Sequence, residues 1–372
     1  MARGRRQLLV PDNADPARGL SVNHLTLRDF RSYARLELEL TGGLVLVVGA
    51  NGSGKTNLLE AVHVGTQGFS PRTRADVQLI RLGAGAARVA VGATRRHNAI
   101  KVELSIARGE GKRVRLNGAS LCRVEQLRSE LPTLVFTPDR LVIVKGGPAV
   151  RRAYFDRALS RLLPARATLP IEYGEVLGQR NVCLHRVAAG SSSQDALPPW
   201  SEQLATLGAS LQDARREVIE RLSPRFSRVA AGLGLGGCRL EYSGERLTVQ
   251  LLEQKLSRDL ERGTTSCGPH LDEIVVFAQE RELRSFGSQG EQRTAVLALL
   301  LAEAELLAEQ DTGPPVLLLD DVLSELDRDR RAALADRLSS LGQTIVTATN
   351  AGALPVTPNL TICVHDGKAE AA

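Results

Sequence analysis

The sequence predicts an α/β fold of two lobes, in which a mainly helical arm interrupts a strand-rich head. Three observations support this prediction. A glycine-rich loop at residues 49–56 joins an apolar, β-branched run to a run with helical character. An Arg-, Ala- and Leu-rich region with helical spacing extends over residues 148–227. A second apolar run, at residues 316–319, ends in two aspartates. Short apolar runs of this kind, bounded by turn residues, are typical of buried strands.

The predicted elements of the first part of the chain come in this order. Residues 1–20 are basic and then rich in Pro, Asp and Ala, which predicts a disordered extension. Alternating apolar residues predict half-buried strands at 25–27 and 36–40. Further strands are expected at 44–48, 89–93, 100–106 and 134–136, with Asn117-Gly118 as a turn signal.

The second part changes in character after Pro138. A helical region is expected over residues 148–227, with a break at 190–199 and a second helical run at 200–222. Strands should resume at 238–252, followed by a helix at 288–309 and by strands at 316–319, 344–347 and 360–364, the last closing the sheet. The predicted domains are therefore an extension (1–20), a first head segment (21–138), an arm (139–265) and a second head segment (266–372).

Composition excludes several classes of protein. The chain has 372 residues, of which 43% are hydrophobic, so it can bury a large core. No apolar run reaches the roughly 18 residues of a membrane helix, and the N-terminus lacks the apolar centre of a secretory signal. The five scattered cysteines argue against a disulfide framework and against zinc. We expect a soluble, cytoplasmic protein.

Charge is distributed unevenly along the chain. The net charge is +6, but residues 1–138 carry 21 basic and 11 acidic residues, and residues 139–265 carry 19 and 14. Residues 266–372 carry 8 basic and 17 acidic residues. The basic part is a candidate surface for a polyanion such as DNA. Ordinary solvated arginine remains an equal alternative, since only six of the 48 basic residues are Lys.

The loop at residues 49–56 fits the P-loop pattern G-x-x-x-x-G-K-[ST], in the strand–loop–helix context that this motif requires. Backbone N–H groups of such a loop surround phosphates, and the helix N-terminus adds its positive end. We expect Lys55 to reach the β- and γ-phosphates of ATP and the Thr56 hydroxyl to ligate Mg²⁺. The full set of nucleotide-binding residues expected here is Gly49, Asn51, Gly52, Ser53, Gly54, Lys55, Thr56 and Asn57.

The aspartates after residues 316–319 complete the predicted nucleotide site. The carboxyl end of a buried strand is where a P-loop sheet presents its Mg²⁺-side carboxylate. Asp320 would hold Mg²⁺, and Asp321 would orient or deprotonate the attacking water, which makes Asp321 and Lys55 the candidate catalytic residues. An acidic strand end alone is a weak signal, and it becomes strong in a chain that already has a P-loop.

The stretch Ser288-Gln289-Gly290 precedes a predicted helix. An ordinary N-cap by Ser288 is one interpretation, and phosphate binding at a helix N-terminus is the other. Its position about 30 residues before Asp320, with Ser324-Glu325-Leu326-Asp327 after Asp321, gives the order of signature, Walker B and D-loop in ABC ATPases. There the signature caps the γ-phosphate of ATP held by the other subunit.

These motifs resemble the RecF family of recombination mediators, which belongs to the ABC group with the SMC proteins. The resemblance covers residues 22–367, and its most specific parts are Gly268-Pro269-His270, Ser288 to Arg293 and the doubled aspartate. Other matching stretches are 27–33, 57–61, 70–73, 136–139, 147–156 and 179–181. It implies an ABC-type ATPase head with a helical arm shorter than an SMC coiled coil.

The resemblance also implies a function and partners. An ATP-driven homodimer, associated with the nucleoid, would close on double-stranded and gapped DNA. It would help to load recombinase together with RecO and RecR, and slow hydrolysis of ATP would release the DNA. Arg31 and Arg72 would support the nucleotide from the side, because related ATPases carry basic residues there, although a plain surface arginine is as good an interpretation. The chain departs from the family pattern at three places. Glu291 replaces a frequent Gln and is expected to be peripheral. Thr349 stands near the position where ABC ATPases commonly have a switch His, and no Q-loop Gln follows residue 136.

Three other functions could use the same ATPase motifs. A transporter ATPase subunit is disfavoured because 233 residues separate Lys55 from Ser288, with a basic arm between them. A nuclease fusion is disfavoured because no acidic cluster lies outside the Walker B region. An SMC-like chromosome scaffold outside recombination remains the alternative. The residues expected to contact DNA are Arg95, Arg96, Lys112, Arg113 and Arg115, and His270 is expected to be a structural turn residue.

Overall fold

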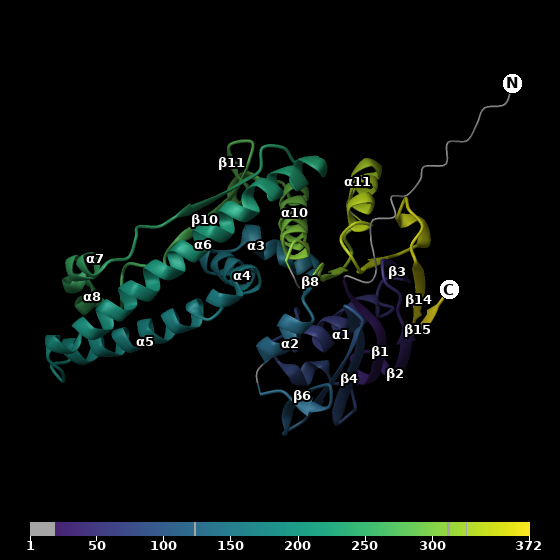
Figure 1. Ribbon diagram of the computed structural model, residues 1–372, viewed down its shortest axis with the longest axis horizontal. Helices are drawn as coiled ribbons and strands as arrows, with labels where there is room; N and C mark the ends of the chain where they lie inside the picture. Colours follow the sequence, from purple (N-terminus) through teal and green to yellow (C-terminus); the bar gives the residue numbers. More distant parts are fainter. Residues whose placement is uncertain (1–18, 123, 311–312, 325) are drawn as a thin grey trace. The chain divides into compact units, whose positions relative to one another are not determined.

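The computed structural model describes residues 19–122, 124–310, 313–324 and 326–372 (Figure 1). The chain forms two compact units: a first unit of Met1–Val135 and Ala308–Ala372, and a second unit of Phe136–Leu307. Most of the extension predicted at 1–20 lies outside the described residues, and the first strand already begins at Leu20. The functional division into head and arm stays a prediction.

An antiparallel sheet forms one layer of the first unit. Its strands are β1 (Leu20–Phe30), β2 (Tyr33–Glu39), β4 (Ala86–Arg95), β5 (Asn98–Ala107), β6 (Gly111–Leu116) and β7 (Ala119–Ser120), in the order β2-β1-β4-β5-β6-β7. Buried and exposed residues alternate along β4 and β6, as expected for a sheet with one solvated face. The predicted turn at Asn117-Gly118 is confirmed, and both residues have positive φ.

A largely parallel sheet forms a second layer. Its strands are β3 (Leu44–Val48), β8 (Thr133–Phe136), β12 (Val316–Leu319), β13 (Thr344–Ala348), β14 (Leu360–His365) and β15 (Lys368–Ala371), in the order β15-β14-β3-β13-β12-β8. Strand β13 thus lies between the strand before the glycine loop and the strand before the two aspartates. The prediction that the strand at 360–364 closes the sheet is wrong, because the chain turns back and β15 pairs with β14 as the edge.

Helix α1 (Lys55–Gln67) is buried between these layers, since it contacts β1, β4 and β5 on one side and β12 and β13 on the other. Every residue from Leu58 to Gln67 is buried, and a helix covered all round belongs to a protein core. At Gly65 an added Cβ would lie 2.3 Å from Cγ2 of Val91. Glycine at this position therefore lets the helix approach β4. The unit also contains α2 (Val124–Glu130) and α11 (Arg328–Leu338).

The second unit is mainly helical. Its elements are α3 (Val142–Lys145), α4 (Pro148–Leu162), α5 (Leu169–Ala188), α6 (Pro198–Gly232), β9 (Arg239–Ser243), α7 (Val249–Gln254), α8 (Leu256–Arg262), β10 (Glu273–Ala278), β11 (Arg281–Glu282), α9 (Leu283–Phe286) and α10 (Gln289–Ala308). Among the described residues, no helix combines the length and apolar character needed to cross a bilayer.

Three sequence expectations for the second unit need correction. The first helical run is two helices, because the chain breaks near Pro164 between α4 and α5. The second run extends past its expected end to Gly232, with Pro224 inside the helix. The strand expected over 238–252 ends at Ser243, and Thr248 caps α7 by accepting a hydrogen bond from the N–H of Leu251. The cap at Thr248 explains this last difference, because it starts a helix where the sequence pattern predicted a strand.

Replacing Gly65 by alanine should destabilise the first unit. The added Cβ would overlap Val91, and overpacking of a core costs about 1 to 3 kcal/mol, more than the roughly 1 kcal/mol that alanine contributes as a helix former. Thermal unfolding followed by circular dichroism measures the change. Val91→Ala should partly rescue Gly65→Ala, and a double variant no more stable than Gly65→Ala would contradict this account.

Gly174→Ala is the matched control for this prediction. Gly174 lies in α5, is exposed, and an added Cβ there would meet nothing within 4 Å. Alanine should therefore leave stability unchanged or raise it slightly.

Candidate functional site

The glycine loop joins β3 to α1 in a conformation that requires glycine at position 54. Gly54 has a φ of 114°, and an added Cβ would lie 3.0 Å from the Ser32 hydroxyl oxygen and 3.1 Å from that of Tyr33. The Tyr33 hydroxyl donates a hydrogen bond to the Gly54 carbonyl at 3.0 Å. Nζ of Lys55 donates to the carbonyls of Gly49 and Ala50 at 2.7 and 2.8 Å. The lysine therefore lies over the concave backbone of its own loop.

The two sides of the predicted nucleotide site meet at Asp320. Its Oδ1 accepts a hydrogen bond from the Thr56 hydroxyl at 3.1 Å and another from the Thr347 hydroxyl at 2.9 Å. Asp320 is 5% exposed, and burial raises the pKa of its carboxyl, while the two hydroxyl donors lower it. The structure thus brings together the hydroxyl and the carboxylate that the sequence assigned to Mg²⁺.

Asp321 occupies a different environment from its neighbour. It is exposed, and its φ of 50° is in the left-handed region, which is unfavourable for a residue with a side chain. Its N–H donates to the Thr347 hydroxyl at 2.8 Å. Thr347 therefore contacts both aspartates, a role that sequence reasoning missed. The available signal was a polar residue at the end of the β-branched run at 344–347, where a strand was predicted.

The residues present fit a magnesium nucleotide. The Ser53 hydroxyl is buried in the glycine loop without a hydrogen-bond partner among the described residues, so a ligand oxygen can satisfy it. Mg²⁺ prefers oxygen ligands and is usually held by one or two protein oxygens together with phosphates, which the Thr56 hydroxyl and the Asp320 carboxylate supply. Asn51 and Gly52 are exposed at the tip of the loop.

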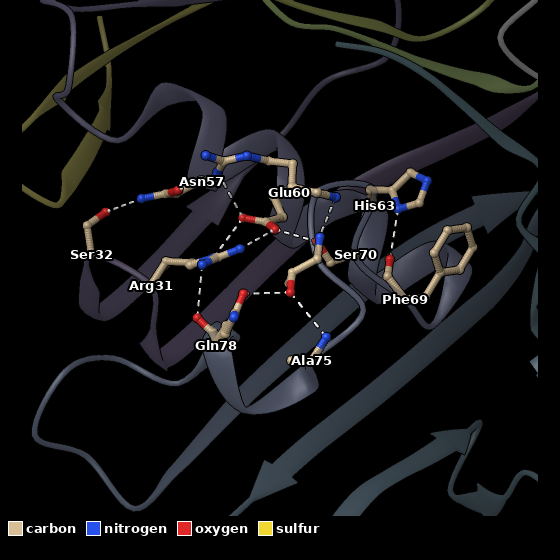
Figure 2. Close-up of polar contacts among 11 residues, drawn as sticks. Arg31, Ser32, Asn57, Glu60, His63, Phe69, Ser70, Ala75 and Gln78 are labelled. Carbon is tan, nitrogen blue, oxygen red and sulfur yellow. Dashed lines mark hydrogen bonds and ion pairs between the residues drawn. The ribbon is translucent and has the colours of Figure 1, made fainter. Parts of the chain in front are cut away.

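A buried carboxylate, Glu60, lies one turn further along α1 (Figure 2). Its side chain is 1% exposed. Arg31 binds both of its oxygens through Nε and Nη2, at 2.9 and 2.7 Å, and the Ser70 hydroxyl donates to it at 2.5 Å. Nη1 of Arg72 donates to Oε2 of Glu60 at 3.3 Å. We name Glu60, Arg31, Ser70 and Arg72 the Glu60 cluster.

Asn57, in the first turn of α1, links the Glu60 cluster to Ser32. Arg72 donates to Oδ1 of Asn57 at 3.2 Å. Nδ2 of Asn57 donates to the Ser32 hydroxyl at 3.0 Å (Figure 2). The structure therefore brings Arg31, Arg72 and Asn57 together, as one region beside the glycine loop. Sequence reasoning chose the arginines and missed Glu60, the group that positions them, because a glutamate in a helix gives no sign that it is buried.

The predicted signature begins α10 in the second unit. The Ser288 hydroxyl accepts a hydrogen bond from the N–H of Glu291 at 3.2 Å, and the Glu291 carboxylate accepts one from the N–H of Ser288 at 2.7 Å. This reciprocal pair is a capping box, which gives Glu291 a structural role at the start of α10. The expectation that Glu291 is peripheral to the nucleotide stays a prediction. The hydrogen bond from the Ser288 backbone lowers the pKa of Glu291. Ser288, Gln289 and Gly290 are all exposed.

The basic residues expected to contact DNA divide into two groups. In the first group, Nη1 of Arg95 lies 3.2 Å from the Glu130 carboxylate, and Nζ of Lys112 lies 3.0 Å from the Asp76 carboxylate. Both basic side chains are mostly buried. Arg113 and Arg115 are exposed on β6. Arg96 belongs to the exposed group and lies at the turn between β4 and β5 with a positive φ.

The motif around His270 belongs to a buried network of the second unit. One ring nitrogen of His270 bonds the Tyr173 hydroxyl at 2.7 Å and the other lies 3.1 Å from the Thr265 carbonyl, while burial lowers the pKa of the ring. Arg215 donates to the Pro269 carbonyl and to both oxygens of Asp156. These contacts fit the structural role expected for His270.

The buried P-loop helix, the strand inserted between β3 and β12 and the Thr56–Asp320 contact define a class of protein, an ABC-type P-loop ATPase head. The family model described as RecF/RecN/SMC N terminal domain matches residues 21–368. The chain belongs to the RecF family, which confirms both the resemblance and the fold class expected from the sequence.

Individual relatives agree with this assignment. The chain is 37% identical over 354 residues to the DNA replication and repair protein RecF of Frankia alni, with 88% of this chain and 93% of that protein covered. It is 36% identical over 346 residues to the RecF protein of Halothermothrix orenii, covering 88% and 92%. A solved structure of the recombination mediator protein RecF with ATP, in the RecFOR pathway, has a TM-score of 0.84 at 26% identity, covering 95% of this chain and 99% of that chain.

Glu60→Gln should destabilise the first unit by about 3 to 5 kcal/mol, because removing one partner of a buried ion pair leaves Arg31 without its counter-charge. Urea unfolding measures the loss. Glu37→Gln, at an exposed position of β2, is the control and should change stability by less than about 0.5 kcal/mol. Equal effects of the two substitutions would show that the Glu60 cluster contributes nothing.

Proposed function

We propose that this chain is an ATP-dependent DNA-binding protein of recombinational repair and replication restart. The observation that carries the proposal is the contact of Thr56 with Asp320, because it joins the glycine loop to the acidic strand end in one magnesium-nucleotide site. The relatives named as DNA replication and repair proteins support the assignment to DNA metabolism.

ATP would bind along the glycine loop. The backbone N–H groups of residues 49–54 and Lys55 would hold the phosphates. Bound Mg²⁺, held by Thr56 and Asp320, would neutralise charge on the β- and γ-phosphates. Asp321 would orient or deprotonate the attacking water, and its left-handed backbone supports this assignment, since backbone strain clusters at functional sites. Arg31 and Arg72 would support the nucleotide from the side, held in place by Glu60.

The ATP-bound form would be a homodimer. In the ABC arrangement, Ser288 and Gly290 of one subunit cap the γ-phosphate of ATP in the other, and two-fold symmetry makes this contact twice. ATP bound between subunits favours the dimer by linkage, and its hydrolysis releases the dimer. The exposed N-terminus of α10 and the neighbouring Phe286, which is 68% exposed, support an interface there.

The dimer would close on double-stranded DNA near gaps and help to load recombinase together with RecO and RecR. The basic character of residues 1–265 and the RecFOR pathway of the related solved structure support these partners. Slow, DNA-stimulated hydrolysis would make ATP a switch for DNA release. A deletion strain should be sensitive to ultraviolet light, whereas an SMC-like scaffold outside recombination, the alternative, predicts chromosome-segregation defects with normal resistance.

Substitutions at the two aspartates should separate ATP binding from hydrolysis. Asp320→Ala should lose magnesium-dependent ATP binding, as should Lys55→Ala. Asp321→Asn should bind ATP with near wild-type affinity and hydrolyse it at least about a hundredfold more slowly, because the amide keeps the shape of the side chain and lacks the base. Fluorescent-nucleotide titration and phosphate release measure the two properties. Wild-type turnover by Asp321→Asn would remove it from the mechanism.

Substitutions at the signature should change dimerisation in opposite directions. Ser288→Arg should abolish the ATP-dependent dimer without loss of ATP binding, and Glu291→Gln should strengthen the dimer, because Gln keeps the capping box and removes a negative charge from the phosphate-facing helix end. Ser288→Ala controls for the lost cap. Sedimentation with and without ATP is the measurement, and a wild-type protein that stays monomeric while hydrolysing ATP fully would contradict the dimer.

A further inference from the structure

A row of arginines crosses the antiparallel sheet on its outer face. Strand pairing places Arg35 of β2 opposite Arg28 of β1, Arg28 opposite Arg88 of β4, Arg88 opposite Ser105 of β5, and Ser105 opposite Arg113 of β6. All four arginines are exposed. Their neighbours in sequence, such as Leu27, Val89 and Val114, point to the opposite face and are buried. We name Arg28, Arg35, Arg88 and Arg113 the arginine row.

The arginine row is unfavourable for the stability of the free protein. Like charges directly opposite one another on neighbouring strands are destabilising, and the row contains two such pairs in succession, Arg35–Arg28 and Arg28–Arg88. Within the part of the chain that the structure describes, Arg28, Arg35 and Arg88 form no ion pair, and Arg113 pairs only with exposed Glu110. The acidic residues of this face, such as Glu37 and Glu103, lie in the adjacent row.

The geometry of the row suits a long, regular polyanion. Neighbouring strands are about 4.8 Å apart, so four steps from β2 to β6 span roughly 19 Å. Over that length a B-form duplex carries about eleven phosphate charges. On the other side of the row the outward positions hold small residues, Ala86, Ala107 and Gly111, which leave the guanidinium groups accessible. The guanidinium fork matches phosphate oxygens well.

We propose that the arginine row is the surface with which this protein binds the phosphate backbone of duplex DNA. The proposal rests on the DNA binding put forward above and names its site. A duplex is favoured over single-stranded DNA because the row presents no aromatic side chain on which bases could stack. Arg95 and Lys112, chosen from sequence, are engaged by Glu130 and Asp76 and contribute little to this surface.

The test compares two variants that remove the same charge. Row-Q carries Arg28→Gln, Arg35→Gln and Arg88→Gln. The control carries Arg186→Gln, Arg258→Gln and Arg262→Gln, three exposed arginines of α5 and α8. Binding of a labelled mixed-sequence duplex to the full-length protein with ATP and Mg²⁺ is measured by anisotropy at several salt concentrations. ATP affinity and thermal unfolding are measured for each variant.

Row-Q should bind duplex DNA at least about tenfold more weakly than wild type, with a salt slope smaller by about 2 to 3, because each lost phosphate contact lowers the slope by about 1. The control should bind within about twofold of wild type. ATP affinity should not change, and Row-Q should unfold at the same or a higher temperature, because like-charge pairs are gone. This combination separates a binding surface from a structural one.

Three outcomes overturn the proposal. If Row-Q binds DNA as well as wild type, the row serves another partner, such as an acidic protein, and the DNA-binding function itself stands. If Row-Q and the control lose the same affinity, only total charge matters and the row has no special part. If the wild-type protein does not bind duplex DNA with ATP, both this proposal and the DNA binding on which it rests are wrong.

Discussion

The buried carboxylate of Glu60 is the constraint on which the glycine-loop end of the first unit depends. Helix α1 is covered by sheets on both sides, so a charge within it loses its hydration, at an effective cost of several kcal/mol. That charge is tolerable only with close counter-charges and donors, which Arg31, Ser70 and Arg72 supply. The segments that carry these residues are thereby fixed against the start of α1, beside the glycine loop. The same four side chains therefore neutralise a charge in the core and position the residues beside the glycine loop.

The strand inserted between β3 and β12 has a comparable effect on the acidic side. A single hydroxyl, that of Thr347 on β13, donates to Asp320 and accepts from the N–H of Asp321. Asp320 is therefore buried and accepts a hydrogen bond from Thr56, while Asp321 is exposed to solvent and has a left-handed backbone conformation. Two adjacent identical residues acquire different environments, which is the physical basis for assigning them different roles.

Arginine serves two distinct purposes in this chain, which a count of charge does not distinguish. In the second unit, Arg151, Arg180 and Arg215 are at most 3% exposed and are paired with carboxylates or carbonyls. Part of the positive charge of residues 139–265 is therefore internal and structural. The arginine row of the first unit is exposed and poorly neutralised. It is therefore a better candidate for binding DNA than the larger number of arginines in the second unit.

The sequence by itself determined the class of fold, the glycine loop, the acidic strand end and the family, because these depend on short contiguous patterns in which each residue type has one local physical role. Apolar runs and their periodicity also predicted most strands of the first unit and helix α1, but not α2 or α11. It did not determine the order of strands, the edge strand β15, the burial of Glu60 or the bridging by Thr347. It also did not reveal the alignment of Arg28, Arg35 and Arg88. These features depend on which distant segments pack together, and a buried glutamate or an aligned arginine has the same local sequence signal as an exposed, isolated one.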